Sequence, residues 1–133
     1  MPAPALNMRR PNFRIVLSPE SEADLLAIWH WGAARFSPDI ADAHLRDIQK
    51  SVAALRTTPF LAKSRDDLLP GVRAFVVYPT VVFYRVAEET VDIVRVIDGR
   101  RNLAAIFLTT AMLDVLLPAS AFFIHARADQ SGA

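Results

Sequence analysis

The sequence predicts an α+β domain in which an antiparallel helical hairpin covers one face of a mainly antiparallel sheet. Three observations give this prediction. A short alternating run occupies residues 13–17, two segments with helical spacing of apolar residues follow it, and three runs rich in β-branched and aromatic residues lie between residues 73 and 97. The expected order is one N-terminal strand, two helices and a three-stranded antiparallel meander.

The N-terminal strand and the first helix meet at a Ser-Pro-Glu sequence. Residues 13–17 alternate apolar and polar or smaller side chains, as a short strand does. Ser18 suits the cap position, Pro19 fits the first helical turn, and Glu20 favours the positive end of the helix dipole. The helix is expected to reach about Phe36. Its apolar stripe comprises Leu25, Ile28, Trp29, Gly32 and Phe36, with Trp31 at the boundary or in contact with a partner.

A second helix begins at once, because Ser37-Pro38-Asp39 repeats the same start signal. Its apolar residues are Ala41, Leu45, Ile48, Val52 and Leu55. Two helices joined by so short a turn fold back against each other as an antiparallel hairpin. Residues 60–71, which contain a Pro-Gly turn, are expected to form a loop before the first strand of the meander.

The last two strands of the meander form a β-hairpin around residues 87–90. If Val86 and Val91 close its loop, Arg85 lies opposite Asp92 as an opposite-charge pair, and Val82 lies opposite Arg95. One face then carries Val81, Phe83, Val94 and Val96, and the other carries Val82, Tyr84, Val86, Val91, Ile93, Arg95 and Ile97. Either an internal carboxylate pairs with Arg95 or a partner covers it, since a buried cation is costly when unpaired. We expect the helices to cover the opposite face and leave the Arg95 face to a partner.

Composition restricts the function classes. A chain of 133 residues is one domain with a real core, and a net charge of +1 gives no general basis for binding nucleic acid. The chain has no cysteine and its three histidines have no matching ligand set, so we expect no metal and no cofactor. The longest apolar run is shorter than a membrane helix needs, and no signal peptide opens the chain. We expect a cytoplasmic protein with no membrane partner.

Three regions are expected along the chain. Residues 1–12 are rich in proline and read as a flexible extension, and residues 13–107 form the domain. Residues 108–133 form an apolar C-terminal extension that a helix would suit. This tail either covers part of the sheet or associates with another surface, because its apolar residues would otherwise face water.

Three stretches of the sequence together resemble the ParE/RelE-type toxins of bacterial type II toxin–antitoxin modules, and more closely the ParE branch. They read LSPESEADLLAIWHW, LLPGVRAFVVYPTVVFYRV and VDIVRVIDGRRNLAAIF, and the resemblance covers residues 13–107. It implies a small toxin of RelE/ParE-like fold that a cognate antitoxin holds inactive in a toxin–antitoxin hetero-oligomer.

The resemblance to RelE-like members implies cleavage of mRNA on the ribosome. That chemistry needs an acid, a base and stabilisation of charge on the phosphate. The resemblance would assign these tasks to Lys63, Arg65, Arg73 and Arg101. It places Phe107 where RelE has a tyrosine, and phenylalanine has no proton to exchange. The acid and base set is therefore incomplete.

The resemblance to ParE-like members implies a toxin that inhibits DNA gyrase by protein contact, without an enzymatic activity of its own. The residues that would contact the target or the antitoxin are Arg73, Tyr84, Arg95, Arg100, Arg101 and Phe107. Arg73 is equally interpretable as an ordinary cation at the start of a strand, and Arg100 and Arg101 as a solvated end. We favour the gyrase reading over two alternatives, an mRNA interferase and a non-toxic stand-alone relative.

Overall fold

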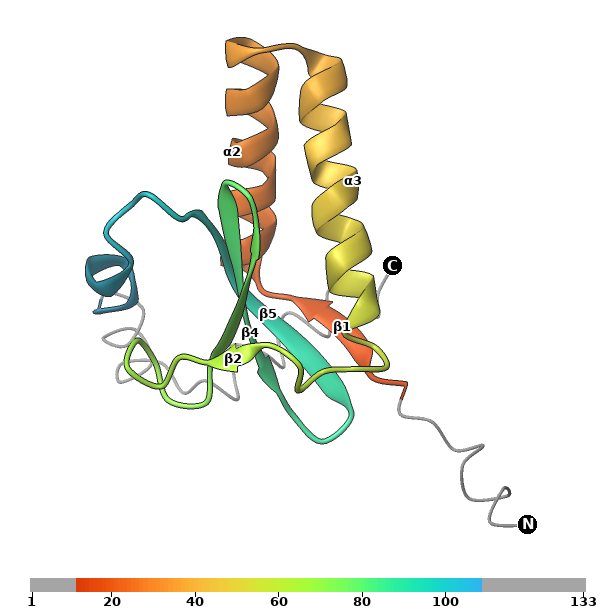
Figure 1. Cartoon of the computed structure of the whole chain (residues 1–133), viewed down its shortest axis with the longest axis vertical. Helices are drawn as coiled ribbons and strands as arrows, with labels where there is room; N and C mark the ends of the chain where they lie inside the picture. Colours follow the sequence, from red (N-terminus) through yellow and green to blue (C-terminus); the bar gives the residue numbers. More distant parts are fainter. Residues whose placement is uncertain (1–11, 109–133) are drawn as a thin grey trace.

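The computed structural model describes residues 12–108. The expected flexible extension and the apolar tail therefore lie outside the described residues, apart from Asn12 and Leu108. The elements are β1 (Arg14–Leu17), α2 (Pro19–Arg35), α3 (Pro38–Ala54), β2 (Lys63–Ser64), β3 (Arg73–Val77), β4 (Thr80–Val86) and β5 (Thr90–Asp98), followed by a helical segment at 103–108 (Figure 1). The predicted α+β fold, with one strand before two helices and a meander after them, is confirmed.

The two helices form the predicted antiparallel hairpin, and both start at the predicted serine caps. The Ser18 side chain accepts a hydrogen bond from the Ser21 amide at 3.0 Å, and Ser37 accepts one from the Ile40 amide at 3.2 Å. Gly32 lets the helices approach closely, because a Cβ there would lie 3.4 Å from the Cβ of Ala41. Figure 1 shows the hairpin extending well beyond the end of the sheet.

The sheet has five strands in the order β1-β5-β4-β3-β2. The three strands of the meander pair antiparallel as predicted, and β1 pairs parallel with β5. The segment expected to be a loop contributes a two-residue strand, β2, which pairs antiparallel with β3 at the sheet edge. A strand this short gives no periodic signal in a sequence.

The register of the β4–β5 hairpin is as predicted near its loop and wrong beyond it. Arg85 pairs with Asp92 and Val86 with Val91, but the register shifts between Phe83 and Tyr84, where β5 carries one extra residue, Val94. Beyond the bulge Phe83, not Val82, lies opposite Arg95. An extra residue on one strand reverses the face of every later side chain on it. Val96 therefore joins the face predicted for Ile97, and Ile97 joins the face predicted for Val96.

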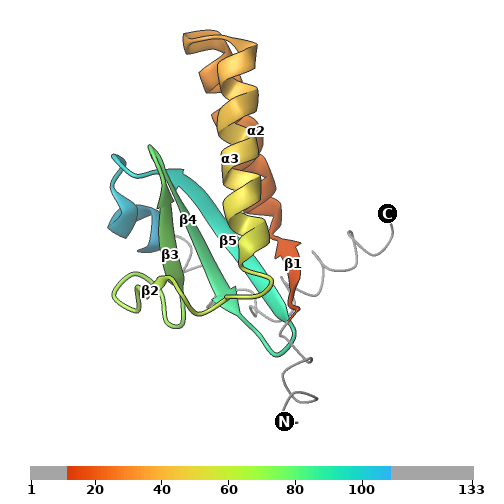
Figure 2. The ribbon, with the colours of Figure 1, turned by 45° about the vertical axis from the view of Figure 1, so that its right-hand side comes forward.

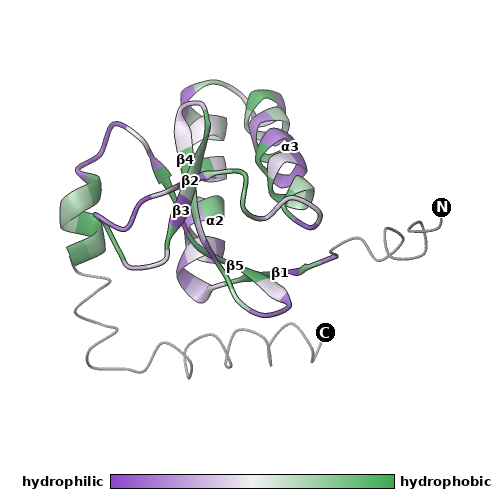
Figure 3. Cartoon of the chain, turned by 60° about the horizontal axis from the view of Figure 1, so that its bottom comes forward, coloured by the Kyte–Doolittle hydropathy of each residue, from purple (hydrophilic) through white to green (hydrophobic). Residues whose placement is uncertain are grey.

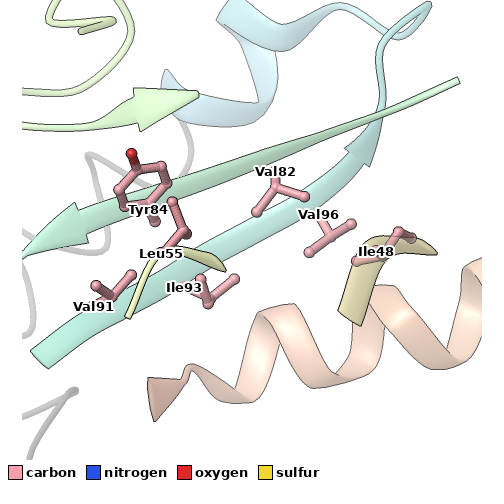
Figure 4. Packing of buried hydrophobic residues seen from close by; sticks show 7 residues of the cluster. All are labelled: Ile48, Leu55, Val82, Tyr84, Val91, Ile93 and Val96. Carbon is pink, nitrogen blue, oxygen red and sulfur yellow. The ribbon is translucent and has the colours of Figure 1, made fainter. Parts of the chain in front are cut away.

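Hydrophobic clusters bury both faces of the sheet. The cluster under the helices comprises Ile48, Leu55, Val82, Tyr84, Val91, Ile93 and Val96 (Figure 4). The cluster on the opposite face comprises Leu69, Val72, Phe83, Val94, Ile97 and Phe107. Figure 2 shows segment 103–108 on the side of the sheet away from the helical hairpin, and Figure 3 shows how apolar that segment is. The expectation of a sheet face left open for a partner is therefore wrong.

Candidate partner-binding site

Arg95 is paired inside the fold, which corrects its predicted role on an open face. Its Nε donates to Oδ2 of Asp24 at 2.7 Å and its Nη2 to Oδ1 at 2.9 Å. Only 19% of the Arg95 side chain and 13% of the Asp24 side chain are exposed. The hydrogen bonds to Asp24 raise the pKa of Arg95 further above its usual value. An internal carboxylate on α2, and not a partner, therefore neutralises this guanidinium.

The reason for this arrangement lies at the free edge of β5. β1 pairs with β5 only as far as Ile93, so α2 supplies the hydrogen-bonding groups for the rest of that edge. The Ser18 hydroxyl donates to the Val94 carbonyl at 2.9 Å, and the Val96 amide donates to Asp24 at 2.9 Å. A carboxylate placed to cap the edge amide of Val96 is also within reach of the Arg95 side chain.

Arg73 and Tyr84 support a turn and are not open contact residues. Arg73 donates to the carbonyls of Ala62 at 2.8 Å and Phe60 at 3.3 Å, and its guanidinium lies 5.1 Å from the centroid of the Phe60 ring. Tyr84 is fully buried, and its hydroxyl donates to the Pro59 carbonyl at 2.7 Å. The expectation that Tyr84 meets a partner on an open face is wrong, because the helices cover the face on which Tyr84 lies.

Phe107 is also buried. Its ring lies 4.6 Å from that of Phe83, centroid to centroid, in an edge-on arrangement. It therefore holds segment 103–108 against the sheet, and in this position it is not available to stack on a base or to meet a partner.

Arg100 and Arg101 are exposed after the end of β5, and Arg100 pairs with a carboxylate. Arg100 forms a bidentate salt bridge with Asp98. Its Nε donates to Oδ1 at 2.9 Å and its Nη2 donates to Oδ2 at 2.6 Å. These hydrogen bonds lower the pKa of Asp98 to about 2. Arg101 lines a groove, described below.

Three residues of the RelE-like alternative are neighbours, because Arg73 pairs in register with Ser64, which lies between Lys63 and Arg65, whereas Arg101 lies apart from them. Arg73 pairs in register with Tyr84, whereas Arg101 follows Asp98, whose register partner is Thr80. Tyr84 lies four residue steps along β4 from Thr80, which is about 13 Å. Arg65 pairs with Asp67 at 2.9 Å, and Lys63 is exposed on β2. Within residues 12–108, no cluster of three or more His, Asp or Glu side chains could hold a metal ion.

An apolar groove of about 460 Å³ opens between the outer part of the helical hairpin and the adjoining ends of β4 and β5. Its apolar lining is Ala27, Ile28, Trp31, Gly32, Phe36, Ile40, Ala41, Pro79, Val96 and Ile97, and its polar lining is Asp24, His44, Thr80, Asp98 and Arg101. Three large side chains stay exposed in it: Trp31 at 53%, Phe36 at 60% and Ile40 at 54%. Apolar grooves of this kind accept the apolar face of an amphipathic helix.

Of these three residues, only Trp31 is predicted from the sequence as a partner contact, and Phe36 and Ile40 are not. Phe36 continues the apolar stripe of α2, a pattern that predicts a core position. It faces water because the hairpin extends beyond the sheet, so no strand lies beneath its outer turns (Figure 1). The sequence carries no local signal of this, because a helix of 17 residues, about 25 Å long, is no longer than the nine-residue strand β5 at about 30 Å.

Comparison with known proteins agrees with this structure. The family model described as ParE toxin of type II toxin–antitoxin system, parDE, matches residues 15–103. Toxin ParE3 of Caulobacter vibrioides is 46% identical over 66 residues, which cover 50% of this chain and 66% of that protein. Toxin ParE1 of Mycobacterium tuberculosis is 33% identical over 91 residues, which cover 68% of this chain and 93% of that protein.

A solved structure shares the fold. A chain in the structure titled "Chromosomal ParDE TA system from P. aeruginosa" superimposes with a TM-score of 0.59 at 24% identity, covering 65% of this chain and 95% of that one. Fold and family match together define a toxin of a type II toxin–antitoxin system. Within that class, the chain belongs to the ParE toxin family.

The described part of the chain offers no membrane span. None of the helices between residues 12 and 108 is both long enough and apolar enough to cross a bilayer.

Proposed function

We propose that this chain is a cytoplasmic toxin that arrests growth by binding DNA gyrase, and that a cognate antitoxin neutralises it. The observation that carries the proposal is the combination of a ParE family match with a large apolar groove whose aromatic and aliphatic side chains face water. Exposed apolar surface of this extent on a small protein is typical of a protein-binding site. Action through binding, without catalysis, is therefore the favoured mechanism.

The antitoxin, in this proposal, covers the groove with an amphipathic helix. Trp31 and Ile40 lie on the two helices at the outer end of the groove, and Arg101 lies on its sheet side. A helix that buries apolar residues between Trp31 and Ile40 would bring an acidic residue near Arg101, where an arginine fork binds a carboxylate well. A segment that is disordered when free would fold as it binds.

Two further features support binding over RNA cleavage. Arg101 lies apart from the other cationic residues of the RelE-like set, and Arg73 and Arg65 already engage groups of the fold. Phe107, at the position where the resemblance places a tyrosine, is buried against Phe83. Chemistry by general acid and base requires such groups within hydrogen-bonding reach of one phosphate.

Inducible expression in bacteria tests the proposal. We expect chromosome damage and filamentous cells, with messages intact in the ribosomal A site, and relief when the antitoxin from the adjoining reading frame is expressed together with the toxin. A gyrase mutant that resists the toxin would strengthen the assignment. Cleaved message with undamaged chromosomes would instead support an mRNA interferase. Harmless expression without an antitoxin would support a non-toxic relative.

A further inference from the structure

A tight turn after α3 carries two large apolar side chains on its outer side. The Leu61 amide bonds to the Thr58 carbonyl at 3.4 Å, which closes the turn with Pro59 at its first corner. Pro59 is buried and Ala62 packs against the main cluster, whereas Phe60 is 60% exposed and Leu61 is 79% exposed. The chain therefore directs its small residues inward and its large apolar residues into water.

The turn is held rigidly from beneath. The buried Tyr84 hydroxyl binds the Pro59 carbonyl, and Arg73 binds the carbonyls of Phe60 and Ala62. The Arg73 guanidinium also lies against the ring of Phe60. Two side chains from β3 and β4 thus fix three of the carbonyls between residues 59 and 62. Because the turn is ordered before any partner arrives, little conformational entropy remains to be lost on binding.

Cations flank this apolar pair along the chain. Arg56 precedes the turn, Lys63 follows it, and both side chains are exposed. The nearby acids are engaged elsewhere, since Asp67 pairs with Arg65, and Asp66 accepts hydrogen bonds from Ser64 and the Gly71 amide. The surface that complements the turn is therefore an apolar pocket with carboxylates at its rim.

We propose that Phe60 and Leu61 are the anchor that this toxin inserts into its target protein, at a pocket of that chemistry. The inference rests on the proposed function, which makes DNA gyrase the target. Neither residue lines the groove assigned to the antitoxin. The two surfaces also differ in shape, because a groove receives a helix from a partner, whereas a projecting rigid turn enters a pocket in one.

The test uses the full chain carrying Phe60→Ser and Leu61→Ser together, compared with Leu26→Ser. Leu26 is a matched control because it is 60% exposed on α2 and lies outside the groove. We expect the double variant to need at least about tenfold more protein to inhibit gyrase supercoiling, while its affinity for the antitoxin changes less than about threefold. The Leu26 variant should match the unaltered chain in both assays. A conservative pair, Phe60→Leu with Leu61→Met, should retain inhibition because the apolar anchor is kept.

The outcomes separate this inference from the proposed function. If the unaltered chain inhibits gyrase and the serine variant inhibits it equally, the inference is overturned and the proposed function stands. Loss of antitoxin affinity with full inhibition of gyrase would also overturn it, by assigning the turn to the antitoxin. If the unaltered chain leaves gyrase active, the proposed function fails and the inference fails with it. Retained antitoxin binding, or retained inhibition of gyrase, shows that the variant is folded.

Discussion

Asp24 performs for the edge of β5 the task that a further strand would perform. The Asp24 carboxylate accepts a hydrogen bond from the Val96 amide and also neutralises Arg95. Without it, the amide would lack an acceptor and the guanidinium would lack a counter-ion. A partly buried ion pair adds little net stability, but removal of one partner leaves an uncompensated charge. Asp24 and Arg95 are thus a residue pair that fixes α2 to the sheet.

Asp24→Asn is expected to destabilise the domain by about 2–4 kcal/mol, because Arg95 then remains charged without a counter-ion. Asparagine still offers an acceptor to the Val96 amide, so the loss reports the charge. Adding Arg95→Met to Asp24→Asn should recover at least half of the lost stability. Urea unfolding measures both variants, with Asp47→Asn at an exposed position of α3 as the control. If the double variant is less stable than Asp24→Asn alone, the charge explanation is wrong.

The environment of Arg95 could not be predicted from the local sequence around it. The opposite-charge pairing of Arg85 with Asp92 was enough to predict the register near the loop. The bulge at Val94, opposite Phe83 and Tyr84, left no signal, because all the residues around it suit either face of a sheet. One extra residue then reversed the later pattern, and the acid that pairs with Arg95 lies 71 residues away in sequence.

At the scale of elements, the helical hairpin has an inner half that builds the core and an outer half that lies beyond the sheet. The inner residues Ile48 and Leu55 pack on β4 and β5, whereas Trp31, Phe36 and Ile40 stay exposed at the outer end. Capping serines and apolar spacing predicted both helices because those signals are local. They could not predict how far along its length each helix is covered.

Replacement of Trp31 and Ile40 by alanine tests the assignment of this outer half. We expect antitoxin affinity to fall by at least about 2 kcal/mol, since exposed aromatic and aliphatic anchors carry most of the energy of such contacts. Stability should change by less than about 1 kcal/mol, because both residues are more than half exposed. Titration calorimetry with the antitoxin measures the affinity. Leu26→Ala serves as the control, and an equal loss there would remove the groove from the antitoxin interface.

At the scale of the whole molecule, hydrophobic clusters within residues 12–108 bury both faces of the sheet, and the surfaces proposed for partners lie at its margins. The helices cover one face, and the loop before β3 with segment 103–108 covers the other. Within residues 12–108, exposed apolar side chains gather at the groove of the outer hairpin and at the turn of Phe60 and Leu61, and others lie at Leu26, Val76, Tyr78 and Leu108. The order and type of the main elements followed from periodicity. The positions of the exposed sites could not be predicted from periodicity, because they depend on where the helices extend beyond the sheet and where the sheet ends.

This distribution favours a protein that acts through contact, and it has room for two partners at once or in turn. The groove and the turn share no residues, so an antitoxin in the groove need not occupy the turn. Neutralisation would then require the antitoxin to block access to the target by its bulk or by extending across the domain.

The most direct test adds the purified chain to a DNA supercoiling reaction driven by gyrase, with and without the antitoxin. We expect supercoiling to fall as toxin is added and to recover when the antitoxin is present in equal amount. Undiminished supercoiling at a large excess of folded toxin would contradict the account.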